Sequence, residues 1–212
     1  MPPTEEPGPG QIRETNSYLL AALVEESGAE AVTLGIIPDQ EPALMAALQQ
    51  TADFDCVVLT GGSSAGTRDH TAACIDALGE PGVLFHGVSM RPGKPLIYGV
   101  INGRPFFGLS GNPTSAMVGF LLFVRPLLRQ MVGVTSHFPT LWAKVERNLS
   151  SASGREDYVR TLLFEKDGEL WATPIFGQSN LLSTVVKGNA LVRIPQNSEG
   201  VEAGEALEVI LI

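Results

Sequence analysis

The spacing of apolar residues divides the chain at about Gly133 into a front part that contains both helix-like and strand-like segments and a back part that contains only strand-like segments. In the front part, apolar residues recur every three to four positions in some segments, which predicts helices, and form short runs in others, which predicts buried strands. Such alternation is typical of a doubly wound, mostly parallel α/β sheet, which binds ligands beyond the carboxyl ends of its strands. The predicted helices cover 14–27, 41–50, 68–78 and 113–131, and the predicted strands cover 31–37, 55–60, 83–88, 96–100 and 105–109.

Residues at the ends of these helices support their boundaries. Gly28 follows the first helix as a C-terminal cap, and Asp39 precedes the second helix as an N-cap. Asn112 and Pro113 open the long fourth helix, because asparagine caps well and proline fits the first helical turn. Pro126 is expected to kink or end this helix, since proline removes a backbone donor.

Beyond Gly133 apolar and polar residues alternate, which is typical of strands with one buried face. Because turns separate these segments and no helical period is present, this part is predicted to be a small all-β barrel or sandwich. Trp142 and Trp171 are expected in its core, and Arg155–Asp157 is expected to be a solvated turn. The predicted strands here cover 141–148, 157–164, 169–173, 190–194 and 206–212. The predicted domains are a flexible leader over 1–13, an α/β domain over 14–136 and a β-barrel domain over 137–212.

Composition narrows the classes of function. The 212 residues are 44% hydrophobic and 17% charged, which indicates a globular protein. A net charge of −9 argues against general nucleic-acid binding, which requires a basic face. The N-terminus has no signal-peptide pattern, and the most apolar stretch, 116–128, is too short and too polar to span a bilayer. The two cysteines form no disulfide framework or metal motif, so we expect buried thiols in a reducing cytoplasm. Together with the absence of a spanning stretch, this leads us to expect no membrane partner.

A glycine-rich loop after the strand at 55–60 carries the clearest chemical signal. Gly61, Gly62 and Gly66 allow backbone N–H groups to approach an anion closely, and the following helix adds partial positive charge. Ser63 and Ser64 can donate hydroxyl hydrogen bonds to a phosphate. The alternative is a plain connection between a strand and a helix, in which glycine is also common.

Two later turns have a similar character. Arg91 and Lys94 flank a Pro-Gly turn and can place two cations on one anion. The alternative is an ordinary surface turn, in which basic residues are also common. The start of the fourth helix also offers exposed N–H groups, although Asn112 is equally explained as a structural cap. The candidate binding residues of this helix start are Ser110, Gly111, Asn112, Pro113 and Ser115.

In order and spacing these motifs resemble the molybdopterin molybdenumtransferase family, which includes MoeA and the E domain of gephyrin. The β-rich part also resembles the family's C-terminal barrel in position and length. The glycine loop alone would equally suit MogA-type adenylyltransferases and CinA-like proteins. The matching stretches are Gly8–Asn16, Leu34–Asp39, Thr60–Asp69, Arg91–Pro95 and Gly108–Ala116.

The resemblance implies that molybdate is inserted into adenylylated molybdopterin while a divalent cation such as Mg²⁺ assists hydrolysis of the adenylate. It implies that Asp39 and Asp69 are catalytic carboxylates and metal ligands, and that Arg91 and Lys94 attract molybdate or the terminal phosphate. The glycine loop and the start of the fourth helix would hold the pterin nucleotide. Family members are homodimers with two additional N-terminal domains, and other cofactor-biosynthesis proteins are further expected partners.

The chain departs from the family pattern in three places. A first strand with an acidic turn, and both upstream domains, would precede Gly8 but are absent from this sequence. Ser110 stands where many members have proline, and Gly87 stands where some have lysine. We therefore expect a partial chain whose own catalysis is in question. The alternatives are a non-catalytic pterin-binding or dimerising scaffold module, and a nucleotide hydrolase of the CinA-like kind.

Overall fold

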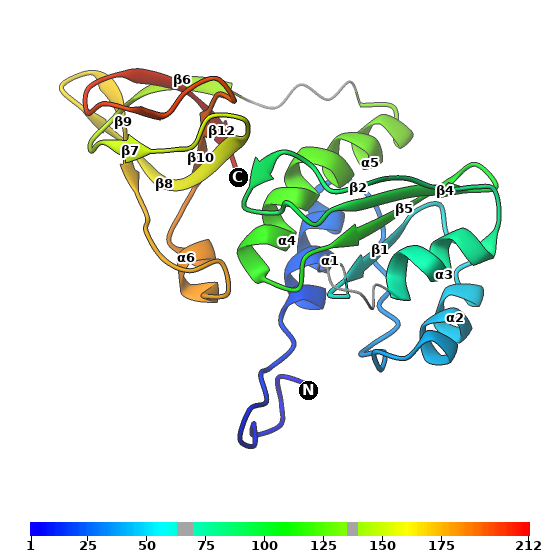
Figure 1. Ribbon diagram of the computed structural model, residues 1–212. Coiled ribbons are helices and arrows are strands. Elements are labelled where there is room, and N and C mark those ends of the chain that lie inside the picture. Colours follow the sequence, from blue (N-terminus) through cyan, green and yellow to red (C-terminus); the bar gives the residue numbers. More distant parts are fainter. Residues whose placement is uncertain (63–69, 135–139) are drawn as a thin grey trace. The chain divides into compact units, whose positions relative to one another are not determined.

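A computed structural model describes residues 1–62, 70–134 and 140–212 of the chain (Figure 1). The chain forms two compact units, of which the first combines Met1–Gly87 with Pro95–Thr135 and the second combines Val88–Lys94 with Ser136–Ile212. The first unit is an α/β fold and the second is a β-barrel, so the expected classes of the two domains are confirmed. The mostly parallel sheet that was expected is not found among the described strands, because two of the three strand pairs are antiparallel. Within the described ranges, no helix has the length and hydropathy needed to cross a membrane.

The first unit is built on a four-stranded sheet with the order β1-β5-β4-β2. β1 and β5 are parallel, whereas the pairs β5–β4 and β4–β2 are antiparallel. The turn at Asn102 and Gly103 explains the antiparallel pair, because both residues have positive φ (51° and 81°) and form the tight connection of a hairpin. The strands are β1 (Val57–Thr60), β2 (Pro81–His86), β4 (Ile97–Ile101) and β5 (Arg104–Leu109).

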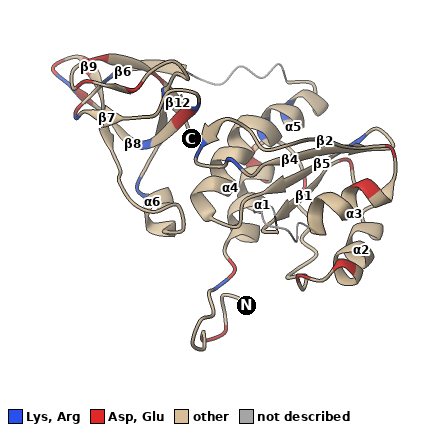
Figure 2. Ribbon diagram, in the orientation of Figure 1, with Lys and Arg blue, Asp and Glu red and all other residues tan. Residues whose placement is uncertain are grey.

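Helices surround this sheet, and their apolar faces make its core. α3 packs on β2 and β4, and α1 packs on α4. Ile75 of α3 meets Ile97 and Phe106 of the sheet in a cluster from which water is excluded, since all three side chains are fully buried. Figure 2 shows acidic residues on α2 and α3, and neither helix contains Lys or Arg. The helices are α1 (Asn16–Glu26), α2 (Glu41–Gln49), α3 (His70–Leu78), α4 (Pro113–Gly119) and α5 (Arg125–Met131).

The predicted caps have different outcomes. Gly28 ends α1 as expected: its φ is +89°, and the N–H of the next residue, Ala29, donates to the Val24 carbonyl. The prediction that Asp39 caps α2 is wrong. The extended residue before α2 is Gln40, and no side chain caps the helix. Asp39 therefore stands one residue too early for its carboxylate to act as the N-cap.

The buried strand predicted over 31–37 is also wrong. No strand is present there, and Val32, Leu34 and Ile36 are exposed. A strand requires a neighbour for its backbone groups, and among the described strands β1 pairs only with β5. The apolar run indicates a segment that is suited to a sheet, but it receives no partner within the described part of the chain.

The long helix predicted over 113–131 forms, but it contains a wider turn that the sequence did not predict. α4 begins at Pro113 after Asn112, as predicted, and the helical run continues to Met131. Between α4 and α5 the backbone forms a π-helical turn, η1 (Phe120–Val124). Pro126 therefore does not end the segment. We attribute the wider turn to the proline that follows, because proline lacks the backbone donor of a regular helix and crowds the preceding turn.

The second unit is a closed barrel of five strands in the order β10-β12-β6-β9-β8, with β8 pairing back to β10. β6 and β9 are parallel, and the other pairs are antiparallel. Val145, Val192 and Val209 are fully buried members of its core. The strands are β6 (Thr140–Val145), β8 (Glu156–Lys166), β9 (Glu169–Pro174), β10 (Ala190–Ile194) and β12 (Ala206–Leu211).

Smaller elements complete this unit and correct two expectations. One helical turn, α6 (Leu182–Val186), lies in a part predicted to have no helix. Trp142 is 70% exposed, so its predicted place in the core is wrong; strand alternation puts it on the outer face, next to the buried Ala143. The short strands are β3 (Met90–Arg91), which joins β8 in parallel, and the pair β7 (Leu149–Ser150) and β11 (Gly200–Val201).

Candidate functional site

Two of the predicted ligand-binding turns meet at one edge of the first unit's sheet. β1 and β5 are parallel neighbours with Thr60 opposite Leu109, so both strands end at the same edge. The N–H of Gly61, directly after β1, donates to the Leu109 carbonyl over 3.0 Å. The turn after β5 contains Gly111, where a Cβ atom would lie only 3.5 Å from the Gly61 Cα. The glycine turn and the turn that precedes α4 are therefore close neighbours, with room for little more than one methyl group between them.

The backbone at Gly62 explains why glycine is needed in the first of these turns. Its φ is +68°, and a Cβ atom there would approach the Thr71 Oγ1 to 2.7 Å. Only glycine meets both constraints without strain. The loop then continues towards α3 through Ser63, Ser64, Gly66 and Asp69, which all lie outside the described residues.

The start of α4 has the electrostatic character expected of an anion site. Asn112 has the extended backbone of an N-cap, but its side chain makes no capping hydrogen bond, so its interpretation as a side-chain cap is not supported. Instead the Asn112 N–H donates to the Ser110 Oγ over 3.3 Å. The first turn contains no acidic residue, Pro113 is its first residue, and Ser115 is buried. The positive end of the helical dipole is therefore not neutralised by a carboxylate from this turn.

Asn16, at the start of α1, holds the second turn in place, and sequence reasoning did not single it out. Its Nδ2 donates to the Gly111 carbonyl over 2.9 Å across 95 positions of sequence. The side chain is buried, and its Oδ1 has no hydrogen-bond partner among the described residues. An asparagine at the first position of an otherwise apolar helix face is the signal that could have identified it.

Asp39 lies in the exposed turn before α2. No group of three or more His, Cys, Asp or Glu side chains that could hold a metal ion is found in the described part of the chain. A Mg²⁺ site needs fewer protein ligands than this, because the ion usually keeps several waters and takes one or two carboxylates together with substrate phosphates. An accessible single carboxylate such as Asp39 fits that donor set, and Asp69 lies outside the described residues.

The structure places Arg91 and Lys94 in the second unit. Arg91 ends β3, and its Nη1 lies 3.8 Å from the Asp157 Oδ2 of β8. The Arg91 side chain is 65% exposed, whereas the Asp157 side chain is only 6% exposed. Lys94 is exposed, and its carbonyl accepts the Val88 N–H over 3.0 Å, which closes the turn.

The segment Arg155–Asp157 is not the solvated turn that was predicted. Glu156 opens β8, and the buried Asp157 carboxylate accepts a hydrogen bond of 2.9 Å from the Arg155 Nε. The cause is a strand pairing that crosses a long stretch of sequence, because β3 and β8 are parallel neighbours with Arg91 opposite Asp157. Local pattern alone could not reveal such a partner.

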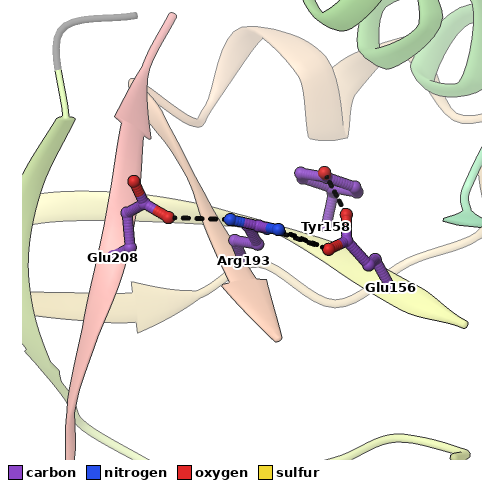
Figure 3. A network of polar contacts seen from close by, with 4 residues as sticks. All are labelled: Glu156, Tyr158, Arg193 and Glu208. Atoms are coloured by element: carbon purple, nitrogen blue, oxygen red, sulfur yellow. Dashed lines mark hydrogen bonds and ion pairs between the residues drawn. The ribbon is translucent and has the colours of Figure 1, made fainter. Parts of the chain in front are cut away.

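A second polar network lies close by on the barrel strands (Figure 3). Arg193 of β10 binds Glu156 of β8 and, over 3.1 Å, Glu208 of β12, and the Tyr158 hydroxyl donates to Glu156 over 2.6 Å. Hydrogen bonds from Arg193 lower the pKa of the Glu156 carboxyl, whereas burial raises the pKa of the Tyr158 hydroxyl. Two carboxylates thus neutralise one guanidinium, and the network links three barrel strands.

Comparison with known proteins places both units in one family. A family model described as "Probable molybdopterin binding domain" matches residues 5–130, and one described as "MoeA C-terminal region (domain IV)" matches residues 143–212. The molybdopterin molybdenumtransferase of Bacillus subtilis is 33% identical over 207 residues, covering 96% of this chain and 48% of the relative. That of Haemophilus influenzae is 33% identical over 211 residues, covering 94% and 50%.

Solved structures agree with these matches. The structure of a molybdopterin biosynthesis MoeA protein from Pyrococcus horikoshii is 34% identical, with a TM-score of 0.86, and covers 100% of this chain and 51% of that one. A molybdenum cofactor biosynthesis protein from Pyrococcus furiosus is 32% identical with a TM-score of 0.77, covering 94% and 65%. The chain spans about half the length of the curated relatives it matches.

Proposed function

This chain belongs to the MoeA family of molybdopterin molybdenumtransferases, and we propose that it binds adenylylated molybdopterin and takes part in the insertion of molybdate. The observation that carries the proposal is the close approach of the glycine turn at Gly61 to the turn at Gly111, which the hydrogen bond from the Gly61 N–H to the Leu109 carbonyl fixes. Backbone N–H groups of two turns and the positive end of a helical run are thereby brought to one edge of the sheet. Such an edge is where α/β folds bind phosphates, because the partial positive charges add up there.

The proposed contacts to the pterin nucleotide follow from this geometry. Backbone groups of the glycine turn and of the helix start would hold the phosphates, while Asn16 keeps the second turn in position through the Gly111 carbonyl. The proposed substrate-binding residues are Gly61, Gly62, Ser63, Ser64, Gly66, Ser110, Gly111, Asn112, Pro113 and Ser115. Figure 1 shows α4 beginning at the end of β5, as this arrangement requires.

The proposed chemistry also uses charged groups. Asp39 and Asp69 would bind Mg²⁺ and orient water, and Arg91 and Lys94 would attract molybdate or the terminal phosphate. Bound Mg²⁺ would neutralise phosphate charge and help a water molecule to attack the adenylate. We further propose that the active form is a homodimer and that the family's N-terminal domains complete the site.

Substitution of Gly111 by alanine tests the binding step. Gly111 has no left-handed backbone, and a Cβ atom would make only ordinary contact with Gly61, so Gly111→Ala is expected to fold. The added methyl group fills the space between the two turns. We expect adenylylated molybdopterin to bind at least about tenfold more weakly, because one charge-assisted hydrogen bond contributes about 1.5–3 kcal/mol.

Isothermal titration calorimetry measures this change, with Gly8→Ala as the matched control. Gly8 lies in the exposed N-terminal segment, where a Cβ atom would contact only its neighbour Gln11. The control should bind like the unmodified chain. Equal affinity of all three proteins for the pterin nucleotide would contradict the proposed site, and an absence of binding by the unmodified chain would contradict the proposed function.

A non-catalytic pterin-binding module is the second candidate, because the backbone groups of the two turns can hold phosphates without any catalytic side chain. Release of AMP separates the possibilities. Incubation with adenylylated molybdopterin, molybdate and Mg²⁺ should release AMP if the chain carries out insertion. Binding without AMP release would indicate the module, and AMP release that does not depend on molybdate would indicate a nucleotide hydrolase.

A further inference from the structure

The outer face of the barrel carries both tryptophans of the chain, Trp142 of β6 and Trp171 of β9. Their neighbours Ala143 and Ala172 are buried in the barrel core, so the two indole rings face outward, because side chains alternate along a strand. Phe164 of β8 is directly opposite Trp171 in the register and therefore lies on the same face. Three aromatic side chains thus lie on three adjacent strands of the barrel.

Two lysines border the Trp171 ring. The Lys144 Nζ lies 5.8 Å and the Lys166 Nζ 5.7 Å from the ring centroid, which is within cation–π distance. Lys144 also donates to both Glu169 carboxylate oxygens over 2.7 Å, so its charge is neutralised. Lys166 is exposed, and among the described residues no ion pair of Lys166 is found, so its positive charge remains. We call this surface the tryptophan face, and it consists of Trp142, Lys144, Phe164, Lys166 and Trp171.

The tryptophan face leaves apolar surface open to water. Trp142 is 70% exposed, and Leu162, which precedes Phe164 by two positions on the same side of β8, is 46% exposed. Tryptophan is among the side chains that contribute most to protein interfaces, where it lies in well-packed surroundings from which water is excluded. A partner suited to this face would cover Trp142 with apolar groups and bring negative charge to Lys166.

The N-terminal segment of the same chain has these properties. Residues 2–12 contain four prolines, two glutamates and no basic side chain. Glu5 and Glu6 are exposed, and Ile12 is 83% exposed. The Glu14 N–H donates to the Met1 carbonyl over 2.8 Å, which closes residues 2–12 into a presented loop. Proline-rich segments dock on aromatic surfaces, because their restricted backbone loses little entropy on binding.

We propose that the tryptophan face binds residues 2–12 of a second copy of this chain. The prolines and Ile12 would cover the aromatic rings, and the Glu5 and Glu6 carboxylates would lie beside Lys166. In a reciprocal pair each copy binds the segment of the other, so the same contact forms twice and the assembly closes as a dimer. The inference goes beyond the proposed function, because it uses none of the residues assigned there.

Tryptophan fluorescence measures this contact directly, because Trp142 and Trp171 are the two tryptophans of the chain. Titration of the full chain with an N-acetylated peptide of residues 2–12 should change the fluorescence until it saturates. Trp142→Ala keeps Trp171 as the reporter and should weaken peptide binding about tenfold, as expected for a tryptophan at the centre of an interface. The same peptide with Glu6→Lys should bind about threefold more weakly, because it brings a positive charge to Lys166.

Sedimentation velocity over a range of concentrations tests whether the segment comes from a second copy. Trp142→Ala should weaken self-association of the full chain at least about tenfold, since the contact forms twice. Phe176→Ala is the matched control, because Phe176 is a 64% exposed aromatic residue of the same unit, and it should change self-association less than twofold. Glu6→Lys should weaken self-association at least about threefold. Its control, Glu30→Lys at another exposed glutamate of the first unit, should change it less than twofold.

The proposal is overturned if the peptide leaves the fluorescence unchanged, or if Trp142→Ala and Phe176→Ala have equal effects. It is also overturned if the chain binds the peptide but stays a monomer, or if a dimer forms equally well in Trp142→Ala. In both cases the tryptophan face would not join two copies. These results do not depend on binding of the pterin nucleotide, so failure of this inference leaves the proposed function to its own test at Gly111.

Discussion

Replacement of Asn16 separates its role in stability from its role in binding. Its Nδ2 donates to the Gly111 carbonyl, while its buried Oδ1 has no partner among the described residues. Asn16→Ala removes one hydrogen bond, which contributes about 0.5–1.5 kcal/mol, and at the same time removes an unsatisfied buried acceptor, which costs about 1–3 kcal/mol. Because these contributions oppose each other, we expect the free energy of unfolding to change by less than about 1 kcal/mol.

Asn16→Asp is the companion variant at the same position. It has nearly the same shape, but it replaces the donor with a buried carboxylate oxygen next to the Gly111 carbonyl. We expect a loss of at least about 2 kcal/mol at pH 7, because a buried charge without a partner is costly. The loss should shrink as the pH falls below about 5, since a protonated carboxyl is uncharged and can donate to the carbonyl.

Urea unfolding followed by far-UV circular dichroism reports mainly on the first unit, because every helix of the described residues except α6 lies there. With a urea slope of about 2 kcal/mol/M, the midpoint of Asn16→Ala should move by no more than about 0.5 M. Binding of adenylylated molybdopterin should nevertheless weaken by up to about tenfold, because the Gly111 turn loses its anchor and must be ordered by the ligand. A loss of stability above about 2 kcal/mol, or unchanged binding, would refute this reasoning.

Two further predictions concern packing and pH. In Gly99→Ala the added Cβ would lie 2.8 Å from the Ile75 Cγ2 and 2.9 Å from the Gly82 carbonyl oxygen. Because overpacking strains a filled core, this variant should destabilise the first unit by about 1–3 kcal/mol in the same urea assay. Unchanged stability would contradict the described packing around Gly99. Burial and the Asp55 carboxylate raise the pKa of the Cys56 thiol to about 12. A thiol with a higher pKa in the folded chain stabilises the fold below its unfolded pKa of about 8.5 and loses that contribution as the pH rises towards 12. Iodoacetamide at pH 8.5 should therefore modify Cys56 much more slowly in the folded than in the urea-unfolded chain, as mass spectrometry of the modified peptide would show; equal rates would argue against this environment.

The elements that local chemistry determines were predictable. Gly28 can adopt the left-handed backbone that ends α1, and Pro113 suits only the first turn of α4, so both boundaries agree with the structure. The fold class followed in the same way from two hydrophobic periods, one helical in the front part and one alternating in the barrel. The turn after β1 was recognisable because Gly61 and Gly62 both have the positive φ that glycine adopts without strain.

Features that depend on distant partners were not predictable. Residues 31–37 have the composition of a strand, yet a strand forms only when a neighbour pairs with it. Trp142 is apolar enough for a core, but the register of β6 turns it outward. Asp157 is buried because β3 pairs beside it, with Arg91 opposite Asp157 although the two residues are 66 positions apart in sequence. Such pairings are decided by topology, which local sequence does not encode.

The membership of β3 in the barrel unit has a consequence for how this chain can be divided. The backbone crosses from one unit to the other at 87–88, returns at 94–95 and crosses again at 135–136. A single cut near 136 would therefore leave the barrel without the strand that carries Arg91, and would leave that strand attached to the α/β unit without its ladder. Each unit is thus built from two separate segments of the chain, so a single cut of the sequence cannot yield both units intact.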